Sequence, residues 1–267
     1  MHLTGVIFDW AGTLVDHGSR APVATLRDVF EGANLPITVE EARLSMGIAK
    51  RAHIASVLTL PRVSSEWQGL YGVAPREVDV DRLYADFVPK QLACLERHSQ
   101  VIAGVPVAIE QLRERGLKIG STTGYTRPML EFLLNLAKAQ GLELDCAVCP
   151  EDVPGGGRPA PWMCYLNAIR LKVGPLWTMV KIGDTPSDIA EGLNAGMWTI
   201  GITLTGNEIG LTAAEWDAIP AAGKSDALAR AGIRLQQAGA HYLAESVADC
   251  LRFLEDIDAR LQAGERP

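Results

Sequence analysis

The sequence is poor in the residues that build disulfide frameworks and zinc sites. Its 267 residues include only five cysteines and five histidines. An odd number of cysteines without a secretory segment predicts free thiols. Cys146 and Cys149 form a C-x-x-C pair, but no second pair accompanies them. Buried structural cysteines are therefore a better interpretation than a zinc or redox site.

Long hydrophobic runs and an excess of positive charge are also missing. No stretch approaches the roughly 18 apolar residues of a membrane helix, and the first apolar run is short and ends at Asp9. We therefore expect no secretory signal, no membrane partner and a cytoplasmic location. The net charge of −7 argues against a nucleic-acid partner. The chain does have 48% hydrophobic residues, enough for a sizeable core.

Short apolar runs recur along the chain, and several are followed by a polar loop and an amphipathic segment. Strands are expected at residues 3–8, 117–122, 146–149, 179–182 and 198–202. Helices are expected at residues 128–140, 161–171, 187–195 and 246–262. Strands that alternate with helices predict an α/β fold with a doubly wound parallel sheet.

Residues 19–98 do not follow this alternation, because they have a helical pattern almost throughout. The pattern is interrupted at Pro36, at Pro61 and at the turn YGVAP. We expect a helical domain at residues 19–98, inserted after the first strand of a core made of residues 1–18 and 99–267. Such an insert would cover the carboxyl ends of the strands, where doubly wound sheets bind ligands.

Carboxylates stand at the ends of two expected strands. Asp9 ends the first strand, and Asp184 ends the fourth, with Asp188 one helical turn later. Any one of them could be a turn or cap residue, but together they could hold a cation or supply a nucleophile. Ala11 stands two residues after Asp9 and cannot transfer a proton, although its carbonyl can bind a metal.

Groups that suit a phosphate lie at the other strand ends. The segment STTGYTR contains Thr123 and Gly124, whose hydroxyl and backbone N–H groups can bind phosphate oxygens. Arg158 lies in the loop GGGRPAPW and offers a planar donor for phosphate. These groups indicate a phosphoryl site at the same edge of the sheet as the carboxylates.

The helical insert contains a candidate amine nucleophile. In LSMGIAKRAHIASVL, Met46, Lys50 and His53 are spaced i, i+4 and i+7, which predicts one face of a helix. A lysine forms a Schiff base with an aldehyde when its pKa falls from about 10.4 toward 7 or 8. Burial beneath the insert would lower it in this way. The alternative is a solvated lysine on an amphipathic helix.

The strand-end residues resemble the four motifs of the haloacid dehalogenase-like superfamily. The matching positions are Asp9, Thr123, Arg158 and the pair Asp184 and Asp188. The resemblance implies a Rossmann-like core with a helical cap inserted after the first motif, an aspartate nucleophile and Mg²⁺ as the cofactor. Phosphatases of this superfamily usually carry a second Asp where this chain has Ala11, and that Asp protonates the leaving oxygen.

Within the superfamily, DWAGTLVD and MGIAKRAH together resemble the phosphonoacetaldehyde hydrolase, or phosphonatase, family. STTGYTR, GRPAPW, GDTPSDIAEGLNAGMWTIG and TGNEIGLT extend the likeness along the chain. The resemblance implies that Lys50 forms an imine with phosphonoacetaldehyde and that Asp9 attacks phosphorus. Ala11 fits this reaction, since a carbon–phosphorus bond has no leaving oxygen to protonate. Ala52 and Leu14 depart from the family pattern, in which Asp and Thr are usual.

The resemblance also implies the roles of the remaining site residues. The catalytic groups are expected to be Asp9, Lys50 and His53. The metal ligands are expected to be Asp9, the Ala11 carbonyl and Asp184, with Asp188 in support. The residues expected to bind substrate and phosphate are Met46, Thr123, Gly124 and Arg158. The expected partners are a small-molecule phosphonate and a second copy of the chain in a homodimer.

Two other functions remain open at this point. The first is a phosphate-ester hydrolase or mutase of the same superfamily, which would need an acid at position 11 and no Lys50. The second is a catalytically inactive phosphonate-binding protein, which would not need Asp9, Lys50 and Asp184 together.

Overall fold

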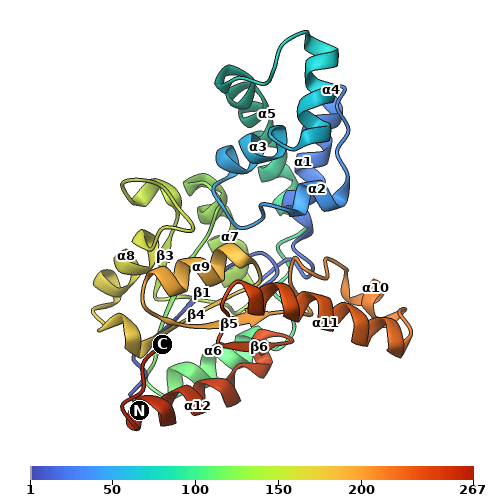
Figure 1. Cartoon of the computed structure of the whole chain (residues 1–267). Coiled ribbons are helices and arrows are strands. Elements are labelled where there is room, and N and C mark those ends of the chain that lie inside the picture. The colour runs from blue at the N-terminus through green and yellow to red at the C-terminus, as the bar shows by residue number, and fades with distance from the viewer. Residues whose placement is uncertain (1) are drawn as a thin grey trace.

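The structure, a computed structural model, describes residues 2–267. A six-stranded parallel sheet with the order β3-β2-β1-β4-β5-β6 occupies the lower part of the molecule (Figure 1). The strands are β1 (Gly5–Phe8), β2 (Lys118–Thr122), β3 (Cys146–Val148), β4 (Met179–Gly183), β5 (Trp198–Ile202) and β6 (Tyr242–Ala244). The five predicted strands are all present, and the α/β, doubly wound fold is confirmed.

The sequence analysis missed β6, because this edge strand has only three residues and two of them are half-buried. The central strands were easier to recognise. All four residues of β1 and all five of β4 are buried, since helices cover both faces of a parallel sheet and favour continuous apolar runs.

Helices pack on both faces of the sheet. On one face, α8 contacts β2 and β3, α9 contacts β4 and β5, and α11 contacts β5 and β6. Figure 1 shows α6 and α12 below the sheet, near the two chain ends. The helices of this part are α6 (Val105–Glu114), α7 (Arg127–Ala139), α8 (Trp162–Leu171), α9 (Pro186–Asn194), α10 (Ala213–Asp217), α11 (Ala221–Gln237) and α12 (Leu251–Gln262), and the short 3-10 helices are η1 (Pro150–Asp152), η2 (Leu176–Thr178) and η3 (Val247–Asp249).

Five helices between β1 and β2 stand above the sheet (Figure 1), and we call them the helical part. They are α1 (Arg20–Gly32), α2 (Val39–Arg43), α3 (Lys50–Leu58), α4 (Pro61–Tyr71) and α5 (Glu77–Leu95). The predicted interruptions match their boundaries, because Pro36 lies before α2 and Pro61 begins α4. A proline is favourable at the first helical position, where its missing N–H has no partner to lose.

The predicted continuous helix through Met46, Lys50 and His53 is wrong. The chain leaves the helix after Arg43, passes through a turn, and begins α3 at Lys50. Gly47 in the turn has a φ of +93°, and a Cβ there would lie 2.2 Å from the Ser187 hydroxyl oxygen. A left-handed conformation and this close approach both require glycine. Met46 therefore reaches Lys50 across a turn rather than along one helix face.

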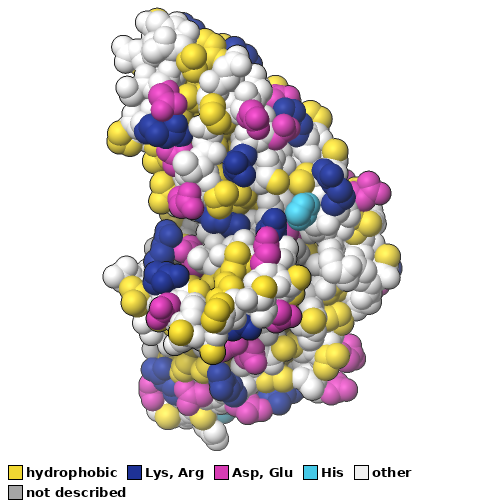
Figure 2. Space-filling view, turned by 90° about the vertical axis from the view of Figure 1, so that its right-hand side faces the viewer, with side chains coloured by type: hydrophobic (Ala, Val, Ile, Leu, Met, Phe, Trp, Pro, Cys, Tyr) yellow, Lys and Arg dark blue, Asp and Glu magenta, His cyan; other side chains and the backbone are white. Residues whose placement is uncertain are grey.

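The hydrophobic core extends through both parts of the molecule, and the surface carries charges of both signs. One buried hydrophobic cluster contains side chains from the sheet, such as Val6 and Ile182, and from the helical part, such as Phe30 and Phe87. The face in Figure 2 carries acidic and basic side chains interspersed. No helix among residues 2–267 is both long and apolar enough to cross a membrane.

Candidate active site

The site begins where β1 and β4 end side by side. Phe8 is in register with Ile182, and the Asp9 N–H donates a hydrogen bond of 2.9 Å to the Ile182 carbonyl. Asp9 and Asp184 therefore leave the same edge of the sheet from neighbouring strands. This is the switch point of the sheet, because β2 lies on one side of β1 and β4 on the other, and such points form ligand clefts.

Three carboxylates converge at this edge. Asp9, Asp184 and Asp188 are buried, and one oxygen of each lies within 4.8 Å of the others. Burial raises the pKa of Asp9, and Arg158 partly offsets the effect. Burial, followed by the charges of Asp9 and Asp188, holds the pKa of Asp184 well above its usual range. Of the three carboxylates, Asp184 is the one whose burial no ion pair among residues 2–267 offsets.

Asp188 has a structural task as well as a place in the cluster. Thr185 is the N-cap of α9. Its hydroxyl oxygen accepts a hydrogen bond from the Asp188 N–H at 3.3 Å, and Asp188 Oδ2 accepts one from the Thr185 N–H at 3.3 Å. This is a capping box, which favours the start of a helix at this position. Although burial alone would raise it, the pKa of Asp188 is lowered by Arg158 and Lys181. The helix-cap interpretation and the cluster are therefore both correct for Asp188.

Arg158 lies at the centre of a fully buried ion network. Its Nη2 is 2.7 Å from Asp9 Oδ1, its Nη1 is 3.0 Å from Asp188 Oδ1, and its Nε is 2.8 Å from Glu191 Oε2. Lys181 from β4 joins the network, with its Nζ 2.8 Å from Asp188 Oδ1. The Arg158 fork is thus held against Asp9, the nucleophile candidate.

The carboxyl end of β2 and the turn before α3 close the pocket from the other side. Thr123 and Gly124 line it together with Met46, Gly47 and Lys50. A Cβ on Gly124 would lie 2.4 Å from the Ile48 carbonyl oxygen, so glycine lets the helical part approach the turn that follows β2. The pocket thus has walls from both parts of the molecule.

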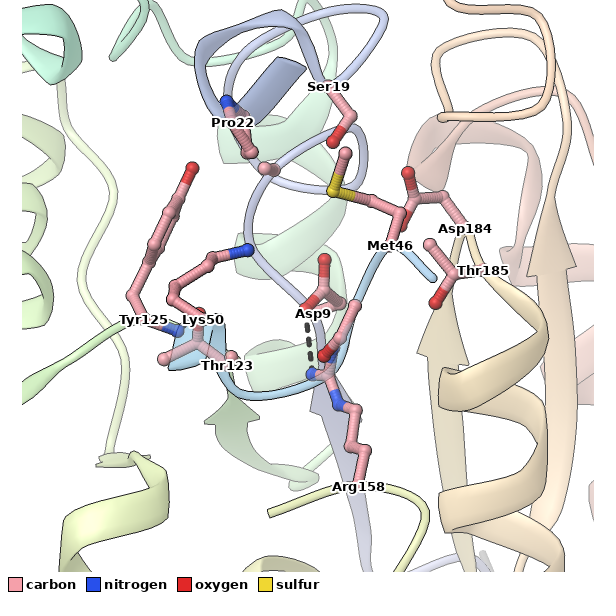
Figure 3. Close-up of a pocket in the computed structure, with 13 residues that line it drawn as sticks. Asp9, Ser19, Pro22, Met46, Lys50, Thr123, Tyr125, Arg158, Asp184 and Thr185 are labelled. Atoms are coloured by element: carbon pink, nitrogen blue, oxygen red, sulfur yellow. Dashed lines mark hydrogen bonds and ion pairs between the residues drawn. The ribbon is translucent and has the colours of Figure 1, made fainter. Parts of the chain in front are cut away.

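Lys50 points into this pocket from the first turn of α3. Figure 3 shows its amine directed between Tyr125 and Asp9, and the residue is only 5% exposed. Burial lowers the pKa of Lys50 to about 8, although the negative charge of Asp9 opposes the shift. Its Nζ lies 4.9 Å from the centre of the Tyr125 ring, whose face attracts a cation. Lys50 is therefore buried, as the Schiff-base hypothesis requires, and is not a solvated lysine on a helix surface.

His53 lies one helical turn after Lys50 but does not line the pocket with it. Its ring is fully buried, and neither ring nitrogen has a hydrogen-bond partner among residues 2–267. Burial, followed by the charge of Lys50, lowers the pKa of His53 to about 3. The ring is therefore neutral at physiological pH.

Comparison with known proteins agrees with this geometry. The sequence profile of haloacid dehalogenase-like hydrolases matches residues 3–196. A phosphonoacetaldehyde hydrolase of Syntrophobacter fumaroxidans is 46% identical over 98% of this chain and 94% of its own length. One of Bacillus cytotoxicus is 43% identical over 97% of both chains. The crystal structure of a phosphonoacetaldehyde hydrolase-like protein of Oleispira antarctica superposes with a TM-score of 0.98, at 38% identity, over 100% of this chain and 96% of that one.

The chain belongs to the phosphonoacetaldehyde hydrolase family. It is a hydrolase with the haloacid dehalogenase-like fold, as the resemblance of its motifs predicted. Both family motifs lie at one pocket in the structure, since Asp9 of DWAGTLVD and Lys50 of MGIAKRAH line it together.

Hydrolases of this superfamily are expected to use a divalent metal, and the carboxylates of this family member fit one. Asp184 Oδ2 accepts a hydrogen bond of 2.7 Å from the Asn207 N–H, whereas buried Asp184 Oδ1 has no partner among the described residues. Carboxylate oxygens are the ligands that Mg²⁺ prefers. A cation would offset the repulsion from Asp9 and Asp188, which adds to burial in raising the pKa of Asp184.

Several residues of the site were missed by the sequence analysis. Ser19 and Thr185 line the pocket, and no spacing in the sequence distinguishes them. Lys181 and Glu191 were detectable, because Lys181 interrupts the apolar run MVKIG and Glu191 lies one turn after Asp188 on the same helix.

Proposed function

We propose that this hydrolase cleaves the carbon–phosphorus bond of phosphonoacetaldehyde and releases acetaldehyde and phosphate. The relatives named above carry that activity in their names. The observation that carries the proposal is the buried Lys50 amine in the same pocket as Asp9, with the Ala11 methyl group where superfamily phosphatases have an acid. We also propose that residues 19–98 form a cap domain and that residues 1–18 and 99–267 form the catalytic core.

The first step is condensation of Lys50 with the aldehyde. The amine attacks the carbonyl carbon, water leaves, and a protonated imine forms. A pKa of about 8 leaves about a tenth of Lys50 uncharged at pH 7, against roughly 0.03% at the ordinary value of 10.5. The buried environment therefore raises the population of the nucleophile roughly 300-fold.

The second step breaks the carbon–phosphorus bond. An oxygen of Asp9 attacks phosphorus, and the bonding electrons of carbon move into the imine, which becomes an enamine on Lys50. No oxygen leaves in this step, so no acid is needed at Ala11. Thr123, Gly124 and Arg158 are proposed to bind the phosphoryl oxygens, and Met46 to line the substrate side of the pocket.

Two further steps return the enzyme to its starting state. Water attacks phosphorus of the aspartyl phosphate, the phosphorus–oxygen bond to Asp9 breaks, and phosphate leaves. The enamine takes a proton on carbon, and water then releases acetaldehyde from Lys50. As the family resemblance implies, we also propose that His53, three residues after Lys50 on α3, assists proton movement near Lys50.

We propose Asp9, the Ala11 carbonyl and Asp184 as ligands of Mg²⁺, with Asp188 in support. Bound there, Mg²⁺ would neutralise charge on the phosphoryl oxygens and so favour attack by a carboxylate. The chain's own contribution is to keep Asp184 Oδ1 free of other partners. The homodimer and the cytoplasmic location stay predictions from the resemblance and the composition.

The decisive experiment assays the purified protein with phosphonoacetaldehyde and with a phosphate ester in parallel. We expect phosphate release from the phosphonate only. Sodium borohydride added with acetaldehyde should reduce an imine, and peptide mapping should locate the added mass on Lys50. Lys50→Arg keeps the charge but cannot form the imine, so it should lose both turnover and labelling.

Lys90→Arg is the matched control. Lys90 lies on α5 and pairs with Asp28 and Asp86 outside the pocket, so this variant should keep full activity and the label on Lys50. Ester hydrolysis without phosphonate cleavage, or a label on another lysine, would replace the proposal with the phosphatase interpretation. Absence of both activities together with tight phosphonate binding would favour the inactive binding protein.

A further inference from the structure

The motif TGNEIGLT resembles the family pattern but has no part in the chemistry proposed above. It spans residues 205–212. All but Thr212, the N-cap of α10, belong to the loop of residues 203–211 after β5, which we call the 203–211 loop. The loop backbone presses against Asp184, because a Cβ on Gly206 would lie 2.6 Å from Asp184 Cβ. The next residue in the loop, Asn207, donates its N–H to Asp184 Oδ2 at 2.7 Å. This one hydrogen bond decides which Asp184 oxygen remains free.

The 203–211 loop is held in turn by a side chain from the helical part. Arg43, the last residue of α2, donates from Nη1 to the Asn207 carbonyl at 3.1 Å and to Asn207 Oδ1 at 2.8 Å. The same nitrogen donates to the Gly18 carbonyl at 3.1 Å, and Nη2 donates to the Gly210 carbonyl at 3.1 Å. Among the described residues, no carboxylate forms an ion pair with Arg43, so all these acceptors are neutral.

Glycine at two positions allows this packing. Gly210 has a φ of +71°, and a Cβ there would lie 2.5 Å from Arg43 Cζ. Gly18 has a φ of +86°, and a Cβ there would lie 2.4 Å from the Leu211 carbonyl oxygen. Gly18 also donates its N–H to the Thr205 carbonyl at 2.7 Å. The 203–211 loop therefore packs closely against the Arg43 guanidinium and against the segment that precedes α1.

We propose that Arg43 is a positioning residue that couples the helical part to the metal ligand Asp184. By fixing the 203–211 loop, Arg43 keeps the Asn207 N–H on Asp184 Oδ2 and leaves Asp184 Oδ1 free for the cation. The inference rests on the proposed function for the role of Asp184 as a metal ligand. It adds that contact of the helical part with the 203–211 loop increases the affinity of the site for the metal. Groups that orient metal ligands in this way change metal affinity without touching the metal.

The geometry requires arginine at this position. The acceptors of Arg43 lie in two segments of chain, and a planar fork with donors on two terminal nitrogens reaches both. A lysine has one nitrogen, so it would keep the positive charge and lose contact with part of the set. Arg43→Lys therefore separates the geometry of the contact from its charge.

The test measures binding of Mg²⁺ alone by titration calorimetry. Arg43→Lys should weaken Mg²⁺ binding about tenfold, the lower end of the range for groups that orient metal ligands. Arg20→Lys is the matched control, because Arg20 also joins the helical part to the sheet part, through Glu215 of α10, but contacts no residue of the 203–211 loop by a hydrogen bond or ion pair. It should leave the Mg²⁺ affinity unchanged.

Gly210→Ala approaches the same contact from the loop side. Its Cβ would displace the Arg43 guanidinium, so it should weaken Mg²⁺ binding in the same direction. The double variant should bind no more weakly than the weaker of the two single variants, since both break one contact. A role of Arg43 in stability alone would lower the melting temperature and leave the Mg²⁺ affinity of the folded protein unchanged.

A last measurement uses the unaltered protein. Because coupling between two sites is reciprocal, Mg²⁺ should slow amide hydrogen exchange in residues 39–47 of wild type. Unchanged exchange there, or wild-type Mg²⁺ affinity in folded Arg43→Lys, overturns the inference. Borohydride labelling of Lys50 needs no metal and should persist in Arg43→Lys. Loss of labelling in wild type would reject the proposed function, while the affinity comparison would still decide the role of Arg43.

Discussion

Arg158 Nη2 lies 2.7 Å from Asp9 Oδ1, so the proposed phosphate-binding group and the proposed nucleophile are in contact within the protein itself. The contact engages one oxygen of Asp9 and holds the guanidinium beside it. Donors arranged before the reaction cost no reorganisation when charge develops in the transition state. The following predictions test the groups around this pair.

Asp9→Asn should reduce phosphate release from phosphonoacetaldehyde by about 10⁴-fold or more, because the amide cannot serve as the nucleophile. Imine formation uses only Lys50, so borohydride labelling of Lys50 should persist in this variant. Steady-state kinetics and peptide mapping on the same sample measure the two effects. Turnover within about tenfold of wild type would show that Asp9 is not the nucleophile.

Lys50 should titrate near pH 8, since burial lowers its pKa to about that value. The uncharged fraction should therefore rise about tenfold between pH 6 and pH 7 and level off above pH 9. Competitive acetylation followed by peptide mapping measures this profile. Lys90 is the internal reference, because its ion pairs raise its pKa and its reactivity should still be rising at pH 10. An apparent pKa above about 9.5 for Lys50 contradicts the proposed environment.

Removal of divalent metal should abolish turnover, and added Mg²⁺ should restore it. The physical reason is the buried set Asp9, Asp184 and Asp188, whose negative charges a hard cation offsets. Labelling of Lys50 should survive chelation, which separates metal loss from unfolding. Phosphate release at the wild-type rate in a metal-free sample would exclude a metal at this site.

Ala11→Asp should not improve phosphonate cleavage, because no oxygen leaves when the carbon–phosphorus bond breaks. The new carboxylate could protonate the leaving oxygen of a phosphate ester, so weak ester hydrolysis is the expected gain. Ala11→Asn has the same shape without the acid and serves as the control. A large rise in phosphonate turnover with Asp but not with Asn would show that an acid at this position does take part.

The fold could be predicted because its main features are local. Central strands of a parallel sheet are buried on both faces and so appear as apolar runs such as GVIF and MVKIG. Prolines at the starts of helices likewise predicted where the helical part is interrupted. β6 was not predicted because three residues are too few to show an apolar run or an alternating pattern. Its hydrogen bonds to β5 make it a strand.

The helix around Lys50 was mispredicted for a physical reason as well. The i, i+4, i+7 spacing of Met46, Lys50 and His53 favours one helix when neighbouring elements are ignored. The close approach of Gly47 to Thr185 and Ser187 of the sheet part favours a turn instead. Contact between distant segments decided the local conformation, and no local pattern could report it.

The sequence by itself determined which chemical groups the site would contain, because carboxylates, hydroxyls and an arginine at strand ends must meet at one edge of a parallel sheet. It also determined the family, through motifs that combine Asp9, Ala11 and Lys50. Only the tertiary structure decided how these groups are held. Packing of the helical part buries Lys50 and so lowers its pKa. Arg158 and Lys181 pair with Glu191, and Arg43 donates hydrogen bonds to the 203–211 loop. Each of these contacts involves residues far apart in the chain. Burial and long-range pairing depend on the packing of the whole chain, which no short stretch of sequence contains.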